Sequence, residues 1–160
     1  MRRIILASLI GVIVLNSCRT NMATFEAGDV NSTRKVLVAG ESSAFKERVV
    51  AGLIDRLGTR DWYFRIIGLN QLEKENTEPY GAILLVAAYR AGRLDVRVTS
   101  YLREDPQNPK TIVFFTRGSE DPLPEKQKPD LRIDAVSSAS RDDQVDMRAD
   151  QLADLVKRRF

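Results

Sequence analysis

The most constraining feature of the sequence is the run at residues 82–88, Ala-Ile-Leu-Leu-Val-Ala-Ala, in which every side chain is apolar. A strand with one solvated face alternates apolar and polar residues, whereas a continuous apolar run requires both faces to be covered. We therefore expect a central strand of a parallel or mixed sheet with helices on both of its faces. Further strand candidates lie at residues 35–39, 62–69, 111–115 and 131–136.

Two segments have the spacing of amphipathic helices. Apolar residues three or four apart predict one helix over residues 45–57, where Ser42 or Ser43 can cap the start and Gly58 can end it. The same spacing predicts a C-terminal helix over residues 145–156. Strands and helices that alternate in this way, in a chain of 160 residues, indicate a single compact α/β domain.

Residues 93–104 fit two patterns. Leu94, Val98, Tyr101 and Leu102 fit a helical face, while strand alternation fits the apolar residues of the same segment almost as well. The Val, Thr and Tyr residues favour a strand by propensity, and the charged residues at both ends favour a helix. The residues alone leave both alternatives open.

The N-terminus has the pattern of a bacterial secretion signal. Arg2 and Arg3 precede about a dozen almost wholly apolar residues, a run too short for a comfortable membrane span of about 20 residues. Cys18, the sole cysteine, follows Leu-Asn-Ser and resembles the lipobox of bacterial lipoproteins, although Asn16 departs from its usual residues. The alternatives are a plain signal peptide with an incidental cysteine and a short hydrophobic core helix.

The lipobox interpretation divides the chain into three parts. Residues 1–17 are the signal peptide, residues 18–34 are the lipidated Cys18 and a flexible polar tether, and residues 35–160 are the folded domain. The mature protein is then expected in the cell envelope, attached to a membrane outside the cytoplasm by a fatty acid such as palmitate.

Charge and residue types exclude several functions. Cleavage removes Arg2 and Arg3, so that 23 basic and 22 acidic residues remain and the net charge falls from +3 to +1, which disfavours nucleic acid as a partner. The chain has no histidine, which excludes Ser-His-Asp and Cys-His catalysis and histidine-based zinc sites. No catalytic or metal-ligating set is predicted, and an enzyme in its own right is not the favoured interpretation.

Three segments resemble flavodoxin-like domains. Residues 80–94, which include the central apolar run, resemble the third strand and its following loop. Residues 110–118 resemble the fourth strand with its Thr-x-Gly loop, and residues 133–140 an ending strand of some members. The resemblance implies a three-layer α/β/α sheet and a helix within residues 93–104. The chain departs from the family at residues 118–130, which are too short and too rich in proline for the fourth helix, so this helix is expected to be missing.

The resemblance also implies FMN as a cofactor and places its contacts. Flavodoxins hold the FMN phosphate at the start of the first helix, where this chain has Ser42 and Ser43. The chain departs from the family there, since a second glycine and a closing threonine are missing and Glu41 adds a negative charge. A role as helix N-cap is sufficient to explain the two serines and is the favoured interpretation.

The other cofactor contacts that the resemblance implies lie in two later loops. The loop after the central strand contributes Tyr89, Arg90 and Gly92, and the next one contributes Thr116 and Gly118. A partly buried tyrosine and a solvated turn are the alternative interpretations of these loops. Ligands bind at the carboxyl ends of strands in open α/β sheets, which is compatible with a ligand-facing role and leaves both interpretations open.

Two functions follow for the anchored domain. The first is FMN-dependent electron transfer, in which the cofactor performs the redox step. The second is a cofactor-free binding or assembly adaptor with an envelope protein as partner. In this second case the domain would be similar to the TolB N-terminal domain, with residues 93–102 as a strand paired to residues 110–116.

Overall fold

A computed structural model of the chain describes residues 21–119 and 133–160, in which seven strands form one sheet. The main path across the sheet is β1-β3-β2-β4-β6-β7, and β5 pairs with β4 beside it. The strands are β1 (Phe25–Gly28), β2 (Lys35–Gly40), β3 (Tyr63–Gly68), β4 (Ala82–Arg90), β5 (Arg93–Leu94), β6 (Thr111–Thr116) and β7 (Asp134–Ser138).

Five of these strands run parallel, in the order β3-β2-β4-β6-β7. Strand β1 adds an antiparallel edge to β3, and β5 pairs antiparallel with the end of β4. The predicted strands at residues 35–39, 62–69, 82–88 and 111–115 are confirmed as β2, β3, β4 and β6.

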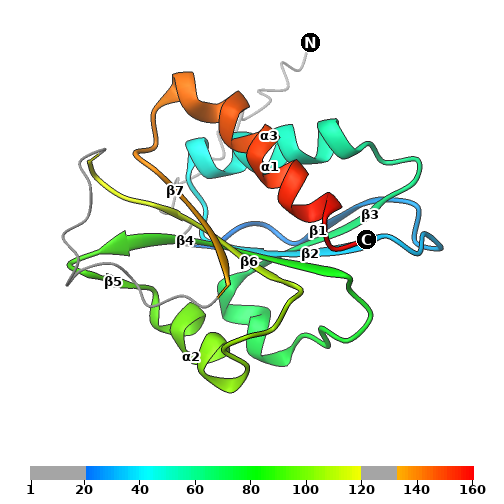
Figure 1. Ribbon diagram of the computed structural model, residues 1–160, viewed down its shortest axis with the longest axis horizontal. Coiled ribbons are helices and arrows are strands. Elements are labelled where there is room, and N and C mark those ends of the chain that lie inside the picture. The colour runs from blue at the N-terminus through cyan, green and yellow to red at the C-terminus, as the bar shows by residue number, and fades with distance from the viewer. Residues whose placement is uncertain (1–20, 120–132) are drawn as a thin grey trace, which may run out of the picture.

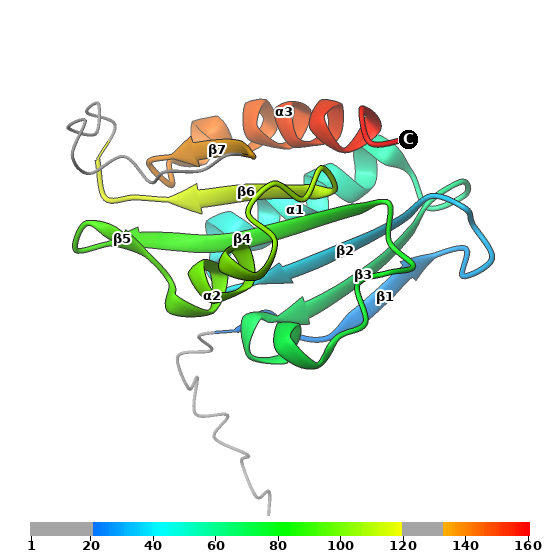
Figure 2. The same cartoon turned by 60° about the horizontal axis from the view of Figure 1, so that its bottom comes forward.

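Helices cover both faces of the sheet (Figures 1 and 2). Helices α1 (Ala44–Leu57) and α3 (Val145–Lys157) pack on one face, and α2 (Val96–Glu104) and the 3-10 helix η1 (Leu69–Lys74) pack on the other. In β4, Leu84 and Val86 point into the first layer, whereas Ile83 and Leu85 point into the second. The continuous apolar run of β4 therefore serves two cores, and the three-layer α/β/α architecture is confirmed.

The residues after Asp95 form a helix and not a strand. The Asp95 side chain accepts a hydrogen bond from the backbone N–H of Arg97, which caps the start of α2. Val98 is then fully buried in the second core. Strand β5 pairs only with β4, so the predicted hairpin between residues 93–102 and 110–116 is wrong.

The predicted tether is wrong over residues 21–34, because part of this segment belongs to the folded domain. Met22 is buried and its N–H donates to the carbonyl of Gly40 at 2.9 Å. Strand β1 then pairs with β3 along its whole length. The sequence obscured β1 because a short edge strand needs no apolar face; its Phe25 is 49% exposed.

Several predictions lie outside the described residues. They include the signal peptide at residues 1–17, Cys18 and most of residues 118–130, where the fourth helix was expected to be missing. The last predicted strand, at residues 131–136, lies partly outside them as well, and β7 begins three residues later than predicted, at Asp134. No helix within the described ranges has the length and apolarity needed to cross a bilayer.

Candidate functional site

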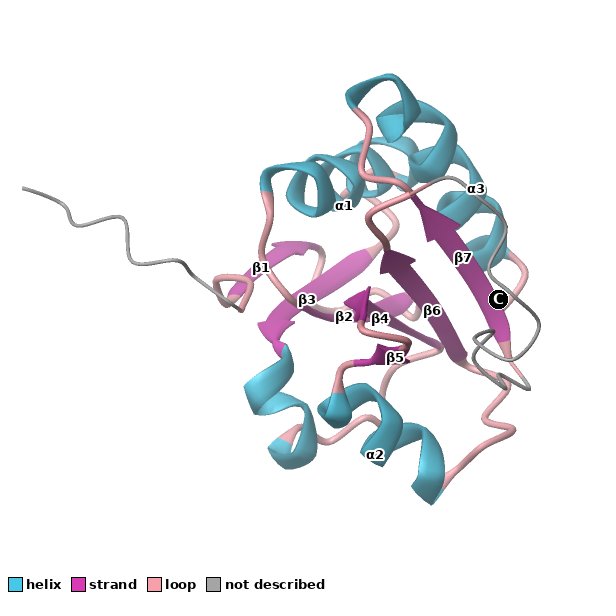
Figure 3. Ribbon diagram, turned by 90° about the vertical axis from the view of Figure 1, so that its left-hand side faces the viewer, coloured by secondary structure: helices cyan, strands magenta, loops and turns pink. Residues whose placement is uncertain are grey.

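The candidate site lies at the carboxyl edge of the sheet, between β2 and β4. From β2 the chain passes through α1 to β3 on one side, and it then returns to place β4 on the other side of β2. The direction of travel across the sheet reverses at this point, and open α/β sheets bind ligands in the crevice there. Figure 3 looks at the molecule from this edge, with the ends of β4 and β6 toward the viewer.

Ser43 is the N-cap of helix α1, and Ser42 contacts a side chain of its first turn. Ser43 Oγ accepts a hydrogen bond from the Lys46 N–H at 3.3 Å, which satisfies one of the free donors of the first turn. Ser42 Oγ donates to Glu47 Oε1 at 2.6 Å. Both hydroxyls thus have partners within the start of the helix.

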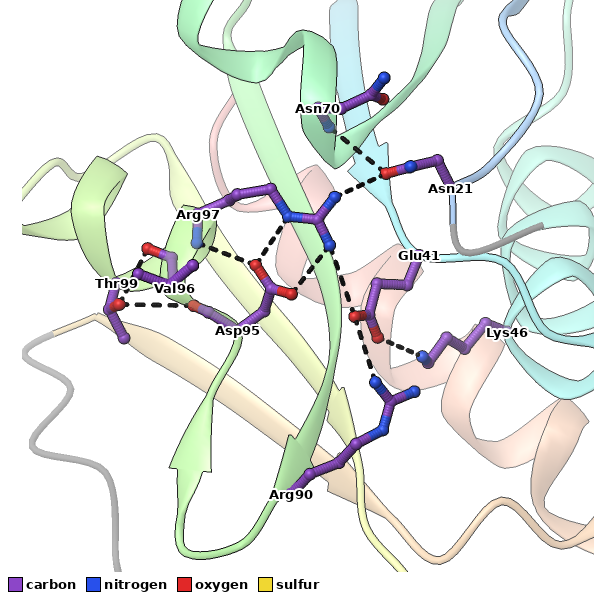
Figure 4. A network of polar contacts seen from close by, with 9 residues as sticks. All are labelled: Asn21, Glu41, Lys46, Asn70, Arg90, Asp95, Val96, Arg97 and Thr99. Carbon is purple, nitrogen blue, oxygen red and sulfur yellow. Dashed lines mark hydrogen bonds and ion pairs between the residues drawn. The ribbon is translucent and has the colours of Figure 1, made fainter. Parts of the chain in front are cut away.

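The buried pair Glu41–Lys46 forms the centre of the site (Figure 4). Glu41 is 4% exposed and Lys46 is 2% exposed, and Lys46 Nζ donates to Glu41 Oε2 at 3.0 Å. Burial lowers the pKa of Lys46, while the hydrogen bond to Glu41 acts in the opposite direction. Removing charges from water costs several kcal/mol per ion, so each group depends on the other for compensation.

Two arginines reach the same carboxylate. Arg90 Nη1 lies 3.6 Å and Arg97 Nη2 lies 3.7 Å from Glu41 Oε1. Glu41 is therefore an anion held among three cations at the end of β2 (Figure 4).

Arg97 also connects the site to Asn21, the first residue that the structure describes. Its guanidinium donates to both carboxylate oxygens of Asp95 at 2.8 Å and to Asn21 Oδ1 at 2.8 Å. These bonds lower the pKa of Asp95 to about 2, because Arg97 stabilises the charged carboxylate. Asn21 Oδ1 accepts a second bond from the Asn70 N–H at 3.4 Å, which holds the entering chain against η1.

The loop between β4 and β5 is a tight hairpin with an arginine on each side. Ala91 and Gly92 have φ values of 49° and 79°, the left-handed backbone of a two-residue hairpin turn. The Tyr89 ring is buried, with its centroid 5.7 Å from that of Phe115, and its hydroxyl donates to the Gly92 carbonyl at 2.8 Å. Tyr89 thus supports the hairpin from the core side.

A pocket of about 520 Å³ lies beside this hairpin. Glu41, Arg90 and Asp95 line it together with Ala88, Arg93, Leu94, Val96 and Thr99. The sequence-predicted residues Thr116 and Gly118 follow at the end of β6, where Thr116 is buried and Gly118 is exposed. The structure thus brings the predicted residues of three strands to one edge, but Ser42, Ser43 and Tyr89 contact the protein itself.

Four residues of the site, Lys46, Asp95, Arg97 and Asn21, were not predicted from the sequence. One signal was available for Lys46, which lies four residues before Val50 and seven before Leu53 on the buried stripe of α1. A lysine on such a stripe indicates a buried partner. Asp95 was recognisable only as a possible helix cap, and no pattern marks Asn21. Within residues 21–119 and 133–160, no three acidic or cysteine side chains cluster in a way that could hold a metal ion.

Comparison with known proteins identifies similar folds. No family model matches the sequence, and the search of curated proteins finds no similar sequence. A flavodoxin from the domain Archaea is similar in structure, with a TM-score of 0.52 and 13% identity over 78% of this chain and 98% of its own. Flavodoxin 2 from Bacillus cereus has a TM-score of 0.54 and 16% identity over 79% of this chain and 99% of its own.

A third similar structure is the flavodiiron protein from Giardia intestinalis, with a TM-score of 0.51 and 14% identity over 80% of this chain. The match covers 36% of that protein. Likeness at these identities concerns the fold. Together with the parallel strand order β3-β2-β4-β6-β7 and the three layers, it shows that this chain has the flavodoxin-like fold.

Proposed function

We propose that the protein is a membrane-anchored binding module that uses a flavodoxin-like domain without FMN. The buried Glu41–Lys46 pair is the observation that carries this proposal. Glu41 directly follows β2, at the turn where flavodoxins hold the FMN phosphate.

The geometry of this turn does not suit a phosphate. A phosphate needs free backbone donors and a positive environment at the start of the helix. Here the Glu41 carboxylate already lies among Lys46, Arg90 and Arg97. The Ser43 hydroxyl caps α1, and the Ser42 hydroxyl donates to Glu47. A dianion would have to approach a buried carboxylate of the same sign, which is unfavourable in a partly desolvated site.

The competing proposal is FMN-dependent electron transfer. The similarity to flavodoxins and the pocket beside the β4–β5 hairpin support it. The charge of Glu41 opposes it, and we therefore favour binding of a protein partner in the envelope.

The test of this choice is an FMN titration. The purified full-length protein in detergent should carry no flavin absorbance, and it should leave the fluorescence of micromolar FMN unquenched. A flavodoxin treated in the same way provides the positive control. Copurified flavin, or quenching in the micromolar range, would overturn the cofactor-free proposal and leave electron transfer as the function.

Membrane attachment through Cys18 is the second part of the proposal, and the lipobox-like sequence supports it. Replacement Cys18→Ala should abolish acylation, measured by mass spectrometry, and move the protein from the membrane to the soluble fraction. Ser17→Ala keeps a small residue before the cysteine and serves as the matched control. Unchanged membrane partitioning of Cys18→Ala would refute the lipid anchor.

A further inference from the structure

We propose that the carboxyl edge of the sheet faces the membrane and that the β4–β5 hairpin contacts anionic lipid headgroups. The inference rests on the proposed Cys18 anchor. It adds an orientation for the domain and a lipid-binding surface, which we call the headgroup face and define as Arg90, Ala91, Gly92 and Arg93.

The length of chain between the anchor and the fold limits how far this edge can lie from the membrane. Asn21 is held by Arg97 and Asn70, and Met22 is buried with its N–H bonded to Gly40. Only residues 19 and 20 separate Cys18 from Asn21. Three Cα–Cα steps span at most about 11 Å, so a lipid on Cys18 keeps the carboxyl edge close to the headgroups.

The β4–β5 hairpin presents two positive charges to solvent, whereas the exposed acidic residues of the same edge, Glu47, Asp142 and Asp143, lie at the starts of α1 and α3. The Arg90 side chain is 75% exposed, and Arg93 is exposed on the other side of the turn. The acidic groups beside them are turned inward, since Glu41 is buried with Lys46 and Asp95 is bound by Arg97 (Figure 4). Arg93 and the solvent-facing part of the Arg90 guanidinium, whose Nη1 lies 3.6 Å from Glu41, can each meet phosphate oxygens of a headgroup outside the Glu41 turn.

An exposed apolar residue adjoins the headgroup face. Val96 begins α2 and is 70% exposed beside Arg93 and the pocket. A cationic turn with an apolar neighbour matches the chemistry of a lipid interface, where basic groups meet phosphates and apolar groups meet the first methylenes. The opposite, amino edge of the sheet carries Asp29 and Asp61 together with Arg34 and Arg60, a mixed set of charges.

The test measures which edge approaches the bilayer. The mature protein, acylated at Cys18, is reconstituted in vesicles of phosphatidylethanolamine and phosphatidylglycerol that carry a quencher on the lipid headgroup. A fluorophore is attached through Ala91→Cys in the headgroup face, or through Arg60→Cys at the amino edge as the control. The label at position 91 should be quenched several-fold more strongly than the label at position 60.

A second arm tests the lipid chemistry. Replacement of Arg90 and Arg93 by Gln should lower the equilibrium constant for the quenched orientation by about 10- to 30-fold, since each basic group near an anionic surface contributes about fivefold. Replacement of Arg60 and Arg103 by Gln, exposed arginines elsewhere, should leave it unchanged. In vesicles of pure phosphatidylcholine, the protein with Arg90 and Arg93 unchanged should show the same decrease in this equilibrium constant.

The outcomes separate the two proposals. Mass spectrometry before reconstitution establishes acylation of Cys18, and its absence overturns both the anchor and the orientation. With the acyl chain present, equal quenching at positions 91 and 60, or stronger quenching at 60, overturns the orientation alone. Equal quenching at position 91 in anionic and zwitterionic vesicles overturns the recognition of anionic headgroups.

Discussion

The Glu41–Lys46 pair lies at the carboxyl end of β2, beside the switch point of the sheet. Its two charges are buried, so the structure depends on keeping both or replacing both. Removal of one partner from a buried pair typically costs 3–5 kcal/mol, whereas removal of both is often nearly neutral.

Lys46→Met should therefore lower the free energy of unfolding by about 3 kcal/mol, because the Glu41 carboxylate loses its nearest cation. The double replacement Glu41→Gln with Lys46→Met should recover most of this loss. Urea unfolding of the single and double variants gives the coupling energy. Arg48→Met, on the exposed face of the same helix, is the control and should cost at most about 1 kcal/mol. If the loss in the double variant equals the sum of the losses in Lys46→Met and Glu41→Gln, the two residues are not coupled.

Asp95 makes a stability contribution that depends on pH. Arg97 lowers the pKa of Asp95 from 3.8 to about 2 in the folded protein, so the ionised carboxylate favours folding above pH 3.8 and this gain disappears as the pH falls to about 2. The shift corresponds to about 2 kcal/mol.

Asp95→Asn retains a capping side chain but has no carboxylate to protonate. As the pH falls from 3.8 to about 2, its free energy of unfolding should therefore decrease less than that of the wild type. Unfolding at a series of pH values measures the difference. Arg97→Gln should remove the same pH-dependent contribution, because it removes the group that holds the carboxylate ionised. Parallel pH profiles for all three proteins would disprove the role of Arg97.

The polar residues of the site were only partly predictable. The capping role of Ser43 and the negative charge of Glu41 could be inferred from adjacent residues, since a helix start is a local feature. The contacts of Glu41 with Arg90 and Arg97 could not, because they join the turn after β2, the end of β4 and the start of α2, which only the folded sheet brings together.

At the scale of elements, β1 is the least predictable strand and its role can be tested directly. Gly28 ends β1 with φ at +94°, and a Cβ at this position would lie 1.9 Å from the Trp62 carbonyl oxygen. A side chain there requires a backbone shift in β1 or in the turn before β3.

Gly28→Ala should consequently lower the free energy of unfolding by about 2 kcal/mol, through backbone strain and the displaced contact. Gly118→Ala is the matched control, since a Cβ at Gly118 meets no atom within 4 Å. Chemical denaturation compares the two. If Gly28→Ala is as stable as the control, the segment before Lys35 behaves as the flexible tether that the sequence suggested.

Helix α2 forms from a segment whose residue pattern fits both a helix and a strand. Val, Thr and Tyr residues gave this segment strand character, and its apolar spacing fitted both periods. The Asp95 cap and the burial of Val98 against the second face of the sheet favour the helix. Burial against a distant element is a tertiary effect, so local propensity could not decide between the two.

At the scale of the whole molecule, the class of fold was predictable because long apolar strands need cover on both faces. The order of the strands was not, since the sequence does not show that β4 pairs with β2 and not with β3. That pairing creates the switch point, and with it the candidate site. The ligand contacts at this edge were expected because of the resemblance to flavodoxin-like domains, since the apolar pattern of the strands does not specify them.

The shared sheet should make the two apolar layers unfold together. Trp62 belongs to the layer of α1 and α3, while Val98 belongs to the opposite layer. Val98→Ala should cost about 2 kcal/mol and should shift the Trp62 fluorescence transition as far as the helical circular dichroism. A Trp62 transition that does not move would mean that the layers unfold separately.

The short antiparallel strand β1 also affects how neighbouring copies of the chain meet. It covers the edge of β3, whose backbone would otherwise offer a six-residue template for strand addition. The edge that remains is four residues long, carries Glu26 and ends at a left-handed glycine. An incoming strand finds few positions to pair there, so this side of the sheet resists the growth of intermolecular β-structure among closely spaced molecules.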